Sequence, residues 1–241
     1  MRLIIIICKF KLRYKNKNMK LSPKDIENMY NKSAWYYDLY STSMWFGMHN
    51  KFREFIVNAL NIEKKDVVLE IGCGTGLNFP FIMKKLGKNG RVIGIDISKK
   101  MLIKARSRIK RNGWDNITLI HGDFNNLEEE KYKMLQDENL TKISMVLIAS
   151  VIPNYEEAIL KSFNLLKNNG RFVIGDLKKL DQHGMGIDIY NKILESSSKK
   201  WGQDFSRKPW NFLKDLQNEG KISHYEFKQM IDIFYAAIGI K

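Results

Sequence analysis

The stretch Asp66-Val67-Val68-Leu69-Glu70-Ile71-Gly72-Cys73-Gly74-Thr75-Gly76 contains an apolar, β-branched run that stops at three glycines spaced two apart. Such a run predicts a short buried strand, and the glycines predict a tight turn where a ligand can touch bare backbone. Apolar residues then recur at helical spacing between positions 77 and 86. The unit is therefore a strand, a glycine loop and a helix, whose free backbone N–H groups favour anionic groups such as carboxylates.

The glycine loop departs from the dinucleotide-binding pattern G-x-G-x-x-G, because position 77, where the third glycine would stand, is Leu. The pattern present is E-x-G-x-G-x-G, with Glu70 two residues ahead of Gly72. An acid at this position suits a ligand that carries a positive amino group as well as a carboxylate. Glycines alone also fit a loop that merely turns the chain, so the motifs that follow decide between the two interpretations.

Three motifs follow one another in the order and at the spacing of a known family. They are Glu70-Ile71-Gly72-Cys73-Gly74-Thr75-Gly76, then Gly94-Ile95-Asp96-Ile97-Ser98, then His121-Gly122-Asp123-Phe124. Together they resemble the class I S-adenosylmethionine (SAM)-dependent methyltransferases, and the likeness spans roughly residues 30 to 241. The stretch Tyr37-Asp38-Leu39-Tyr40, with Met44, Gly47 and His49 after it, further resembles the quinone-pathway C-methyltransferases.

The resemblance implies an α/β fold of the Rossmann-like type. We expect a seven-stranded, mostly parallel sheet in the order 3-2-1-4-5-7-6, with the last strand antiparallel and helices on both faces. Residues 19–241 would form a single methyltransferase domain, with an N-terminal helical lid at residues 19–62 and an acceptor-side insertion at residues 177–220. The implied cofactor is SAM, the product is S-adenosyl-L-homocysteine, and no metal is expected.

The resemblance also implies a cofactor site. The glycines would close on the methionine part of SAM, and Glu70 would balance its amino group. Asp96 would bind the ribose hydroxyls, which agrees with its place roughly 20 residues beyond the glycine loop, and Asp123 would accept from the adenine amino group. The residues expected at the cofactor are Glu70, Gly72, Gly74, Gly76, Asp96, Ile97, Asp123, Phe124 and Ser150.

No single residue stands out as a catalytic base. A sulfonium methyl group is already activated, so the main tasks are to align the acceptor and to exclude water. A carbon acid or a hydroxyl acceptor would also need a general base. The candidates are Tyr37, His49, Tyr155 and His183, each of which also fits a structural role.

Away from the motifs, apolar patterns predict the remaining elements. Helices are expected at residues 49–60, 99–112, 155–167 and around 187–194, and another should begin at Ser22-Pro23 with Ser22 as its cap. Strands are expected at residues 91–96, 117–120, 143–149, 171–176, 224–230 and 233–240. Residues 125–140 are polar and acidic, and we expect a loop there.

Residues 1–18 combine a short apolar run with basic residues. The run is too short to span a bilayer, and the segment lacks the layout of a secretory signal. We expect a disordered or mis-assigned extension, with a weak membrane-surface anchor as the alternative. Cys8 and Cys73 suggest neither a metal site nor a disulfide framework, which agrees with a reducing cytosol.

Two features could bear on the acceptor. The aromatic stretches at 35–46 and 185–212, the second with Trp201, Phe205 and Trp210, are expected to flank the transferable methyl, although the first could equally be core packing of the lid. Residues 99–112 hold seven basic residues, and the net charge of the chain is +15. This helix is expected to be a solvated outer face, and RNA binding is the alternative.

We therefore expect a SAM-dependent methyltransferase (EC 2.1.1) that acts on a small or lipid-like acceptor, for instance of quinone or phospholipid type. The alternatives are an RNA methyltransferase and a non-catalytic SAM-binding regulatory or partner protein. A nucleic-acid partner is disfavoured because no base-stacking pattern of basic and aromatic residues is present. A cytoplasmic location without a transmembrane segment is expected, with peripheral membrane contact left open, and the sequence does not indicate an oligomeric state.

Overall fold

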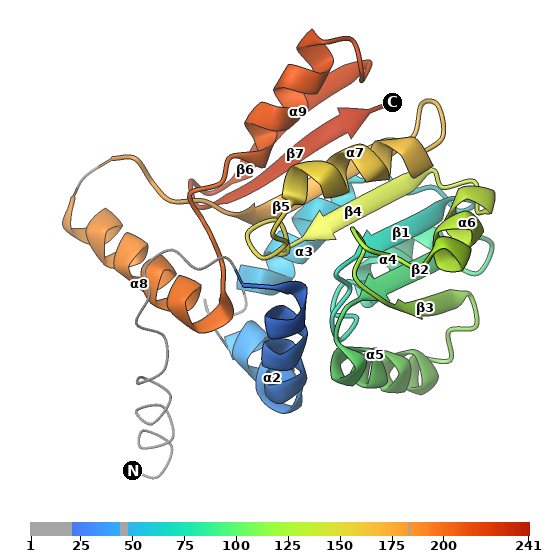
Figure 1. Cartoon of the computed structure of the whole chain (residues 1–241), viewed down its shortest axis with the longest axis horizontal. Helices are drawn as coiled ribbons and strands as arrows, with labels where there is room; N and C mark the ends of the chain where they lie inside the picture. Colours follow the sequence, from blue (N-terminus) through green and yellow to red (C-terminus); the bar gives the residue numbers. More distant parts are fainter. Residues whose placement is uncertain (1–20, 44–47, 183) are drawn as a thin grey trace.

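The computed structural model describes residues 21–43, 48–182 and 184–241 of the chain. At its centre lies a seven-stranded sheet in the order β3-β2-β1-β4-β5-β7-β6 (Figure 1). The strands are β1 (Val67–Ile71), β2 (Arg91–Asp96), β3 (Ile117–His121), β4 (Lys142–Val146), β5 (Arg171–Leu177), β6 (His224–Met230) and β7 (Phe234–Ile240). The expected segment at residues 1–18 and the candidate His183 lie outside the described residues, as do Met44, Trp45, Phe46 and Gly47.

The pairing of the strands confirms the expected topology. β1 pairs in parallel with β2 and with β4, and the parallel ladder continues from β2 to β3 and from β4 to β5. β7 runs antiparallel to both β5 and β6. The order predicted from the sequence and its antiparallel last strand are therefore both correct.

Helices cover both faces of the sheet. They are α2 (Pro23–Ser43), α3 (Met48–Ala59), α4 (Phe79–Leu86), α5 (Lys99–Asn112), α6 (Glu129–Asp137), α7 (Tyr155–Leu165), α8 (Met185–Trp201) and α9 (Pro209–Asn218). One buried cluster joins α6, α7 and α9 to one face, and two others join α3, α4, α5 and α8 to the opposite face. α2 and α8 lie together at the edge toward which the parallel strands point (Figure 1).

The alternation of β1 fixes which way its polar side chain points. Leu69 and Ile71 belong to the core beneath α6, α7 and α9, whereas Val68 belongs to the core beneath α3, α4 and α5. Successive side chains of a strand point to opposite faces of the sheet. Glu70 is therefore placed on the α3 side, although it is flanked by apolar residues and is itself buried.

The local signals for helix ends work as expected at two helices. At α5 the Ser98 hydroxyl accepts from the Met101 N–H at 3.2 Å, and Gly113 closes the helix with a φ of 64°. At α2 the Ser22 hydroxyl and the Asp25 carboxylate exchange hydrogen bonds with each other's backbone N–H. These reciprocal bonds satisfy donors that a helix start otherwise leaves free.

The structure corrects two predicted segments and shows a helix in a third, for which no element was predicted. Residues 129–137 form helix α6 instead of a loop, and the sequence hid it because only Leu135 on this charged helix is buried. Strand β4 ends at Val146 instead of Ala149, since Leu147 takes a positive φ of 58° that no strand can continue. Residues 209–218 form helix α9, which packs against β6, β7 and α7.

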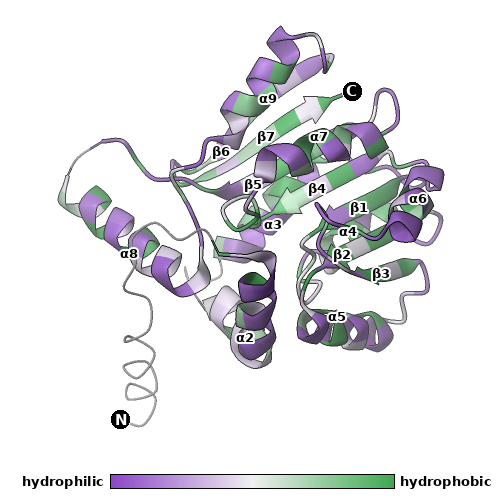
Figure 2. Ribbon diagram, in the orientation of Figure 1, coloured by the Kyte–Doolittle hydropathy of each residue, from purple (hydrophilic) through white to green (hydrophobic). Residues whose placement is uncertain are grey.

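Trp210 was expected to flank the transferable methyl, but it lies on helix α9. Its ring packs against Tyr235 of β7 and Phe227 of β6, with centroids 4.7 and 5.6 Å apart. Figure 2 shows α9 with apolar residues on part of its surface and hydrophilic ones on the rest. Trp210 therefore belongs to the layer that covers the sheet, and not to the acceptor side.

Candidate active site

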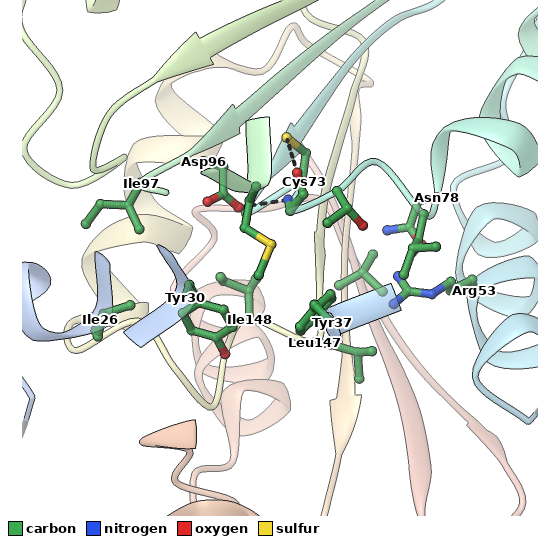
Figure 3. A pocket seen from close by; sticks show the side chains of 16 residues that line it. Ile26, Tyr30, Tyr37, Arg53, Cys73, Asn78, Asp96, Ile97, Leu147 and Ile148 are labelled. Carbon is green, nitrogen blue, oxygen red and sulfur yellow. Dashed lines mark hydrogen bonds between the residues drawn. The ribbon is translucent and has the colours of Figure 1, made fainter. Parts of the chain in front are cut away.

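A pocket opens at the carboxyl ends of β1, β2 and β4, where ligands bind in open α/β sheets. We call it the cofactor pocket. Asp96 and Ile97 lie at one end of it, and Arg53 and Asn78 lie at the other (Figure 3). Both ends are therefore polar, whereas Tyr30 and Ile148 between them give the pocket an apolar middle.

The glycine loop crosses the cofactor pocket with its backbone bare. Gly72 has a φ of +69°, and a Cβ built on it would stand 2.4 Å from Cδ1 of Ile148. Gly74 also has a positive φ, but a Cβ there would meet nothing within 4 Å. Gly76 does not line the pocket, because its α-carbon faces the ring of Phe79. The first two glycines therefore serve the pocket, and the third serves packing.

Asp96 is buried at the end of β2 with both carboxylate oxygens aimed at backbone amides. Oδ2 accepts from the Gly74 N–H and Oδ1 from the Ser98 N–H, each at 2.8 Å. Burial raises the pKa of Asp96 to about 6, and the two amide bonds oppose this rise. A carboxylate has about four acceptor sites, so each oxygen keeps capacity for a hydroxyl of a ligand in the pocket.

A hydrogen-bonded chain forms the other end of the pocket. The Asn78 side-chain amide donates to Glu70 Oε1, and Arg53 Nη1 donates to Asn78 Oδ1 at 2.7 Å. Arg53 Nη2 continues the chain to the Ser41 hydroxyl at 3.2 Å. Burial raises the pKa of Glu70 to about 7, while Asn78 and the Arg53 charge lower it.

Two atoms of this chain are buried without a hydrogen-bond partner. They are Oε2 of Glu70, an acceptor, and Nε of Arg53, a donor. Buried polar groups in folded proteins nearly always find a partner in the protein or in what it binds. Arg53 and Asn78 line the pocket, and Glu70 lies behind Asn78, so this end combines a positive and a negative group. Such a pair fits a ligand that carries both an amino group and a carboxylate, as the methionine part of SAM does.

Helix α2 lies over the cofactor pocket as a lid and is joined to it at two points. Asp38 accepts from the Thr75 hydroxyl at 2.5 Å and from Arg108 of α5 at 2.9 Å. Asn31 Oδ1 accepts from the Ser98 hydroxyl at 2.8 Å and from the Lys100 N–H at 3.1 Å. The basic helix α5 is therefore in part a docking surface for α2, and not only a solvated outer face.

A second pocket lies against the first, beneath α2, α3 and α8, and we call it the acceptor pocket. Tyr30, Tyr37 and Leu147 line both pockets and form the wall between them. Beyond this wall the acceptor pocket is lined by Tyr40, Ser41, His49, Leu177, Ile193, Leu194, Ser197, Trp201, Gln203 and Phe205. Its lining is mostly apolar and aromatic, with a few polar groups.

Trp201, at the end of α8, organises the aromatic side chains of the lid. It is buried, and its ring centroid lies 5.0 Å from that of Tyr40, 5.8 Å from Tyr30 and 6.0 Å from Tyr37. The aromatic residues of α2 are therefore both packing for the lid and a wall of the acceptor pocket. Trp35, by contrast, is 77% exposed.

Two of the candidate bases face the acceptor pocket. His49 lines it, with Nδ1 3.4 Å from the Ser41 hydroxyl, and Tyr37 lines both pockets. Burial and the Arg53 charge lower the pKa of His49 to about 4, so its imidazole is neutral near pH 7. Burial raises the pKa of Tyr37. Tyr155 lines neither pocket, and its hydroxyl donates to Glu156 at 3.1 Å.

Five residues expected at the cofactor do not line its pocket. They are Gly76, Glu70, which lies behind Asn78, and the three residues Asp123, Phe124 and Ser150. The Asp123 carboxylate accepts from the Asn125 N–H at 3.2 Å and from the Asn126 side chain at 2.7 Å, and the Phe124 ring is buried in the core. The Ser150 N–H donates to Asp176 at 3.0 Å, and its hydroxyl is buried without a partner. Their roles toward the adenine and the cofactor stay predictions.

Sequence reasoning missed Arg53, although a signal was present. Helix α3 buries His49, Phe52, Ile56 and Val57, and Arg53 falls on this same face. A charged residue on the apolar stripe of an amphipathic helix is rarely buried unless it is paired. The position of Arg53 within that stripe could have marked it as a functional candidate.

Among the residues that the structure describes, no group of three or more His, Cys, Asp or Glu side chains could hold a metal ion. No helix in this part of the chain has the length and apolar character needed to cross a membrane.

Comparisons with known proteins agree with this geometry. The family described as "Methyltransferase domain" matches residues 62–229. A demethylmenaquinone methyltransferase of Listeria welshimeri is 22% identical over 196 residues, which cover 80% of each chain. The protein of that name from Lactobacillus johnsonii is 26% identical over 188 residues, covering 76% of this chain and 74% of the other.

Solved structures share the fold. A SAM-dependent methyltransferase from Aquifex aeolicus superposes with a TM-score of 0.56 at 16% identity, covering 92% of this chain and 99% of that one. An O-methyltransferase family protein from Burkholderia thailandensis gives 0.70 at 11% identity, covering 100% and 70%. The family match covers well over half of the length of this chain. The chain therefore belongs to the class I SAM-dependent methyltransferases (EC 2.1.1).

Proposed function

We propose that this methyltransferase acts on a small acceptor with an oxygenated aromatic ring, of quinol type, which binds in the acceptor pocket. The observation that carries the proposal is the wall shared by the two pockets, formed by Tyr30, Tyr37 and Leu147. A ring placed against this wall would lie next to the methyl group of SAM in the cofactor pocket. Pockets for small molecules are mostly apolar with a few placed polar groups, and the acceptor pocket has this composition.

SAM would lie along the cofactor pocket, with its ribose at the Asp96 end and its methionine part at the end with Arg53 and Asn78. Asp96 would accept from the ribose hydroxyls next to Ile97, and the bare backbone of Gly72 and Gly74 would let the methionine part approach closely. Glu70 would balance the amino group from behind Asn78. Asp123 and Phe124 remain our candidates for the adenine end.

The chain's own contribution to the reaction is mainly placement. SAM, when bound, supplies an activated methyl group, so the protein must align the acceptor and exclude water. Helix α2, tied down by Asp38 and Asn31, closes the site from above. Two of the described candidates line the acceptor pocket. His49, whose imidazole is neutral, would take the proton that a hydroxyl or carbon acceptor must lose, whereas Tyr37, whose pKa is raised by burial, would donate a hydrogen bond to the acceptor.

The names of the relatives support a ring-shaped acceptor. Demethylmenaquinone methyltransferases are named for an acceptor with an oxygenated ring, and they match across most of this chain. The rings of Tyr37, Tyr40 and Trp201 give the acceptor pocket faces on which such a ring can stack. Stacked and edge-to-face aromatic pairs contribute about 0.5–1.5 kcal/mol beyond the burial of their area.

The test is methyl transfer from isotope-labelled SAM to a reduced, short-chain demethylmenaquinone, followed by mass spectrometry of the product. We expect the product to gain one methyl group. Trp201→Leu should lower kcat/KM for this acceptor about tenfold, as expected for the loss of one or two aromatic contacts. The dissociation constant for SAM, measured by calorimetry, should change less than about threefold because Trp201 does not line the cofactor pocket.

Parallel reactions with total RNA and with phosphatidylethanolamine vesicles separate the other acceptor classes. Label that enters RNA or phospholipid and not the quinol would overturn the proposal, as would a Trp201→Leu variant that methylates the quinol at the full rate. Met134→Ala is the control for nonspecific effects of substitution, because the Met134 side chain is exposed on α6 and lines neither pocket.

A further inference from the structure

We propose that the outer faces of α2 and α8 dock on the surface of an anionic phospholipid bilayer. The two helices lie together at one edge of the molecule (Figure 1). Large apolar side chains are exposed on them, and we call this group the lid patch: Trp35 and Leu39 of α2, and Met185, Ile189 and Ile193 of α8. The docking stands on this patch, whereas its purpose, delivery of a lipid-like acceptor, rests on the proposed function.

The apolar side chains of α8 form a stripe along the helix. Met185, Ile189 and Ile193 follow one another at intervals of four residues, the spacing that places side chains on one face. Met185 is 84% exposed and Ile189 is 55% exposed. The other side of α8 is already buried in the molecule. Exposed groups of apolar side chains mark contacts with other proteins or with membranes.

Lysines beside the stripe indicate that the partner is anionic. Lys192 and Lys199 are exposed and stand seven residues apart, so both lie next to the stripe on the outer face of α8. The acids of the helix are Asp188 and Glu195, and Glu195 is paired with Lys179 at 3.0 Å. Exposed apolar residues with lysines around them are typical of helices that lie in the headgroup region of anionic membranes.

Trp35 extends the lid patch onto α2. Its ring centroid lies 4.9 Å from that of Tyr36, and Lys200 Nζ lies 5.7 Å from the Tyr36 ring. Trp35 therefore stands near the end of α8, and the exposed Leu39 follows one turn further along α2. Tryptophan is enriched where membranes meet water, because its ring is apolar while its N–H can still reach water.

The lid patch is continuous with the acceptor pocket. Ile193 belongs to both, because it is 45% exposed and also lines the pocket. Ser197, one turn further along α8, lines the pocket as well. A bilayer against the patch would thus lie next to this wall of the pocket, so that an acceptor with an apolar tail need not cross bulk water to reach it.

The test is co-sedimentation of the full chain with vesicles of phosphatidylcholine alone and of phosphatidylcholine mixed equally with phosphatidylglycerol. The unaltered protein should bind the mixed vesicles about tenfold more tightly or better, since each lysine near an anionic surface contributes about a fivefold preference. The double variant Met185→Ser/Ile189→Ser should bind the mixed vesicles about tenfold more weakly, because two apolar side chains no longer enter the headgroup region. Leu160→Ser/Ile231→Ser, which changes exposed apolar residues elsewhere, is its matched control.

A second pair of variants tests the charges. Lys192→Gln/Lys199→Gln should weaken binding to the mixed vesicles about tenfold and leave binding to phosphatidylcholine unaltered. Lys84→Gln/Lys85→Gln on α4 removes the same charge from another exposed surface and is the matched control. Neither control should change binding by more than about twofold.

The outcomes that overturn the proposal are distinct. Unaltered binding by the lid-patch variants would place the contact elsewhere, for instance in residues 1–18, which these variants leave intact. Equal weakening by the variants and their controls would mean that charge or apolarity acts without a defined surface. A protein that binds neither kind of vesicle would overturn the proposal as well, as would a dimer of the unaltered chain that Ile189→Ser dissociates without any loss of vesicle binding.

Methyl transfer to the short-chain quinol in vesicle-free solution is the separate readout for the proposed function. Met185→Ser/Ile189→Ser should leave this rate unaltered, because neither residue lines a pocket. If the quinol is not methylated, the proposed acceptor is wrong, and the docking surface is judged on vesicle binding alone.

Discussion

The cofactor pocket and the acceptor pocket share the wall of Tyr30, Tyr37 and Leu147 but differ in how they are built. Most of the cofactor pocket is contributed by loops that follow β1, β2 and β4, and its key bonds are made by backbone amides. The acceptor pocket is lined mostly by side chains of α2, α3 and α8, and α8 lies far from the other two helices in the sequence.

The difference shows in the charges that each pocket buries. The cofactor pocket has Asp96 in its lining and Glu70 behind Asn78, two acids whose pKa is raised by burial, to about 6 and about 7. The acceptor pocket has a base whose pKa is lowered, to about 4 for His49. In both places burial favours the neutral form, but the group that would ionise is an acid in the first and a base in the second. Three experiments test how far this contrast extends.

The largest effect is expected from Gly72→Ala in the cofactor pocket. Both Gly72→Ala and Gly74→Ala place a side chain at a positive φ, which costs about 1–2 kcal/mol. Only at Gly72 would the new Cβ stand 2.4 Å from Ile148, and overpacking of this kind adds about 1–3 kcal/mol. Urea unfolding should therefore show a clearly larger loss for Gly72→Ala, and equal losses for the two variants would contradict the described loop geometry.

The two pockets should respond to pH with opposite signs. Glu70 has a folded pKa above its unfolded value, so the folded protein binds more protons between about pH 4 and 7 and its free energy of unfolding falls as the pH rises. His49 has a folded pKa below its unfolded value, so between about pH 4 and 6.5 it contributes stability that grows as the pH rises. Each contribution is on the order of 3 kcal/mol across its window.

Urea unfolding of the ligand-free protein at several pH values measures both slopes. Glu70→Gln should remove a falling contribution, and His49→Gln should remove a rising one. If both variants changed the slope in the same direction, the contrast between the buried charges of the two pockets would be wrong.

The smallest effect is expected at the contact between the lid and the glycine loop. Asp38→Asn removes the ion pair with Arg108, in which both side chains are partly exposed, and weakens the bond from Thr75. Exposed pairs contribute about 0–1 kcal/mol, so S-adenosylhomocysteine should dissociate about two- to fivefold faster in stopped-flow measurements. Lys24→Met, which breaks an exposed pair on the same helix, is the control and should leave this rate unaltered. An unaltered rate in Asp38→Asn would mean that this contact does not hold the lid.

The sequence predicted the sheet and the cofactor loop well. The run from Val67 to Ile71, the three glycines and Asp96 are local signals, because strands and tight turns depend on short stretches of chain. Helix α5 covers the predicted residues 99–112. Helix α6 escaped prediction because a helix that buries one residue has hardly any apolar pattern to detect.

By itself the sequence thus determined the strands and the place of the glycine loop, because these depend on patterns along neighbouring residues. The order of the strands followed from the resemblance of the three motifs to a known family. The tertiary structure decided what those patterns could not carry. Packing of α3 against the sheet buried Arg53 beside Asn78, and packing of α8 beneath α2 brought Trp201 among the tyrosines of the lid. Such contacts join residues separated by long stretches of chain, so the acceptor pocket exists only after the helices have packed.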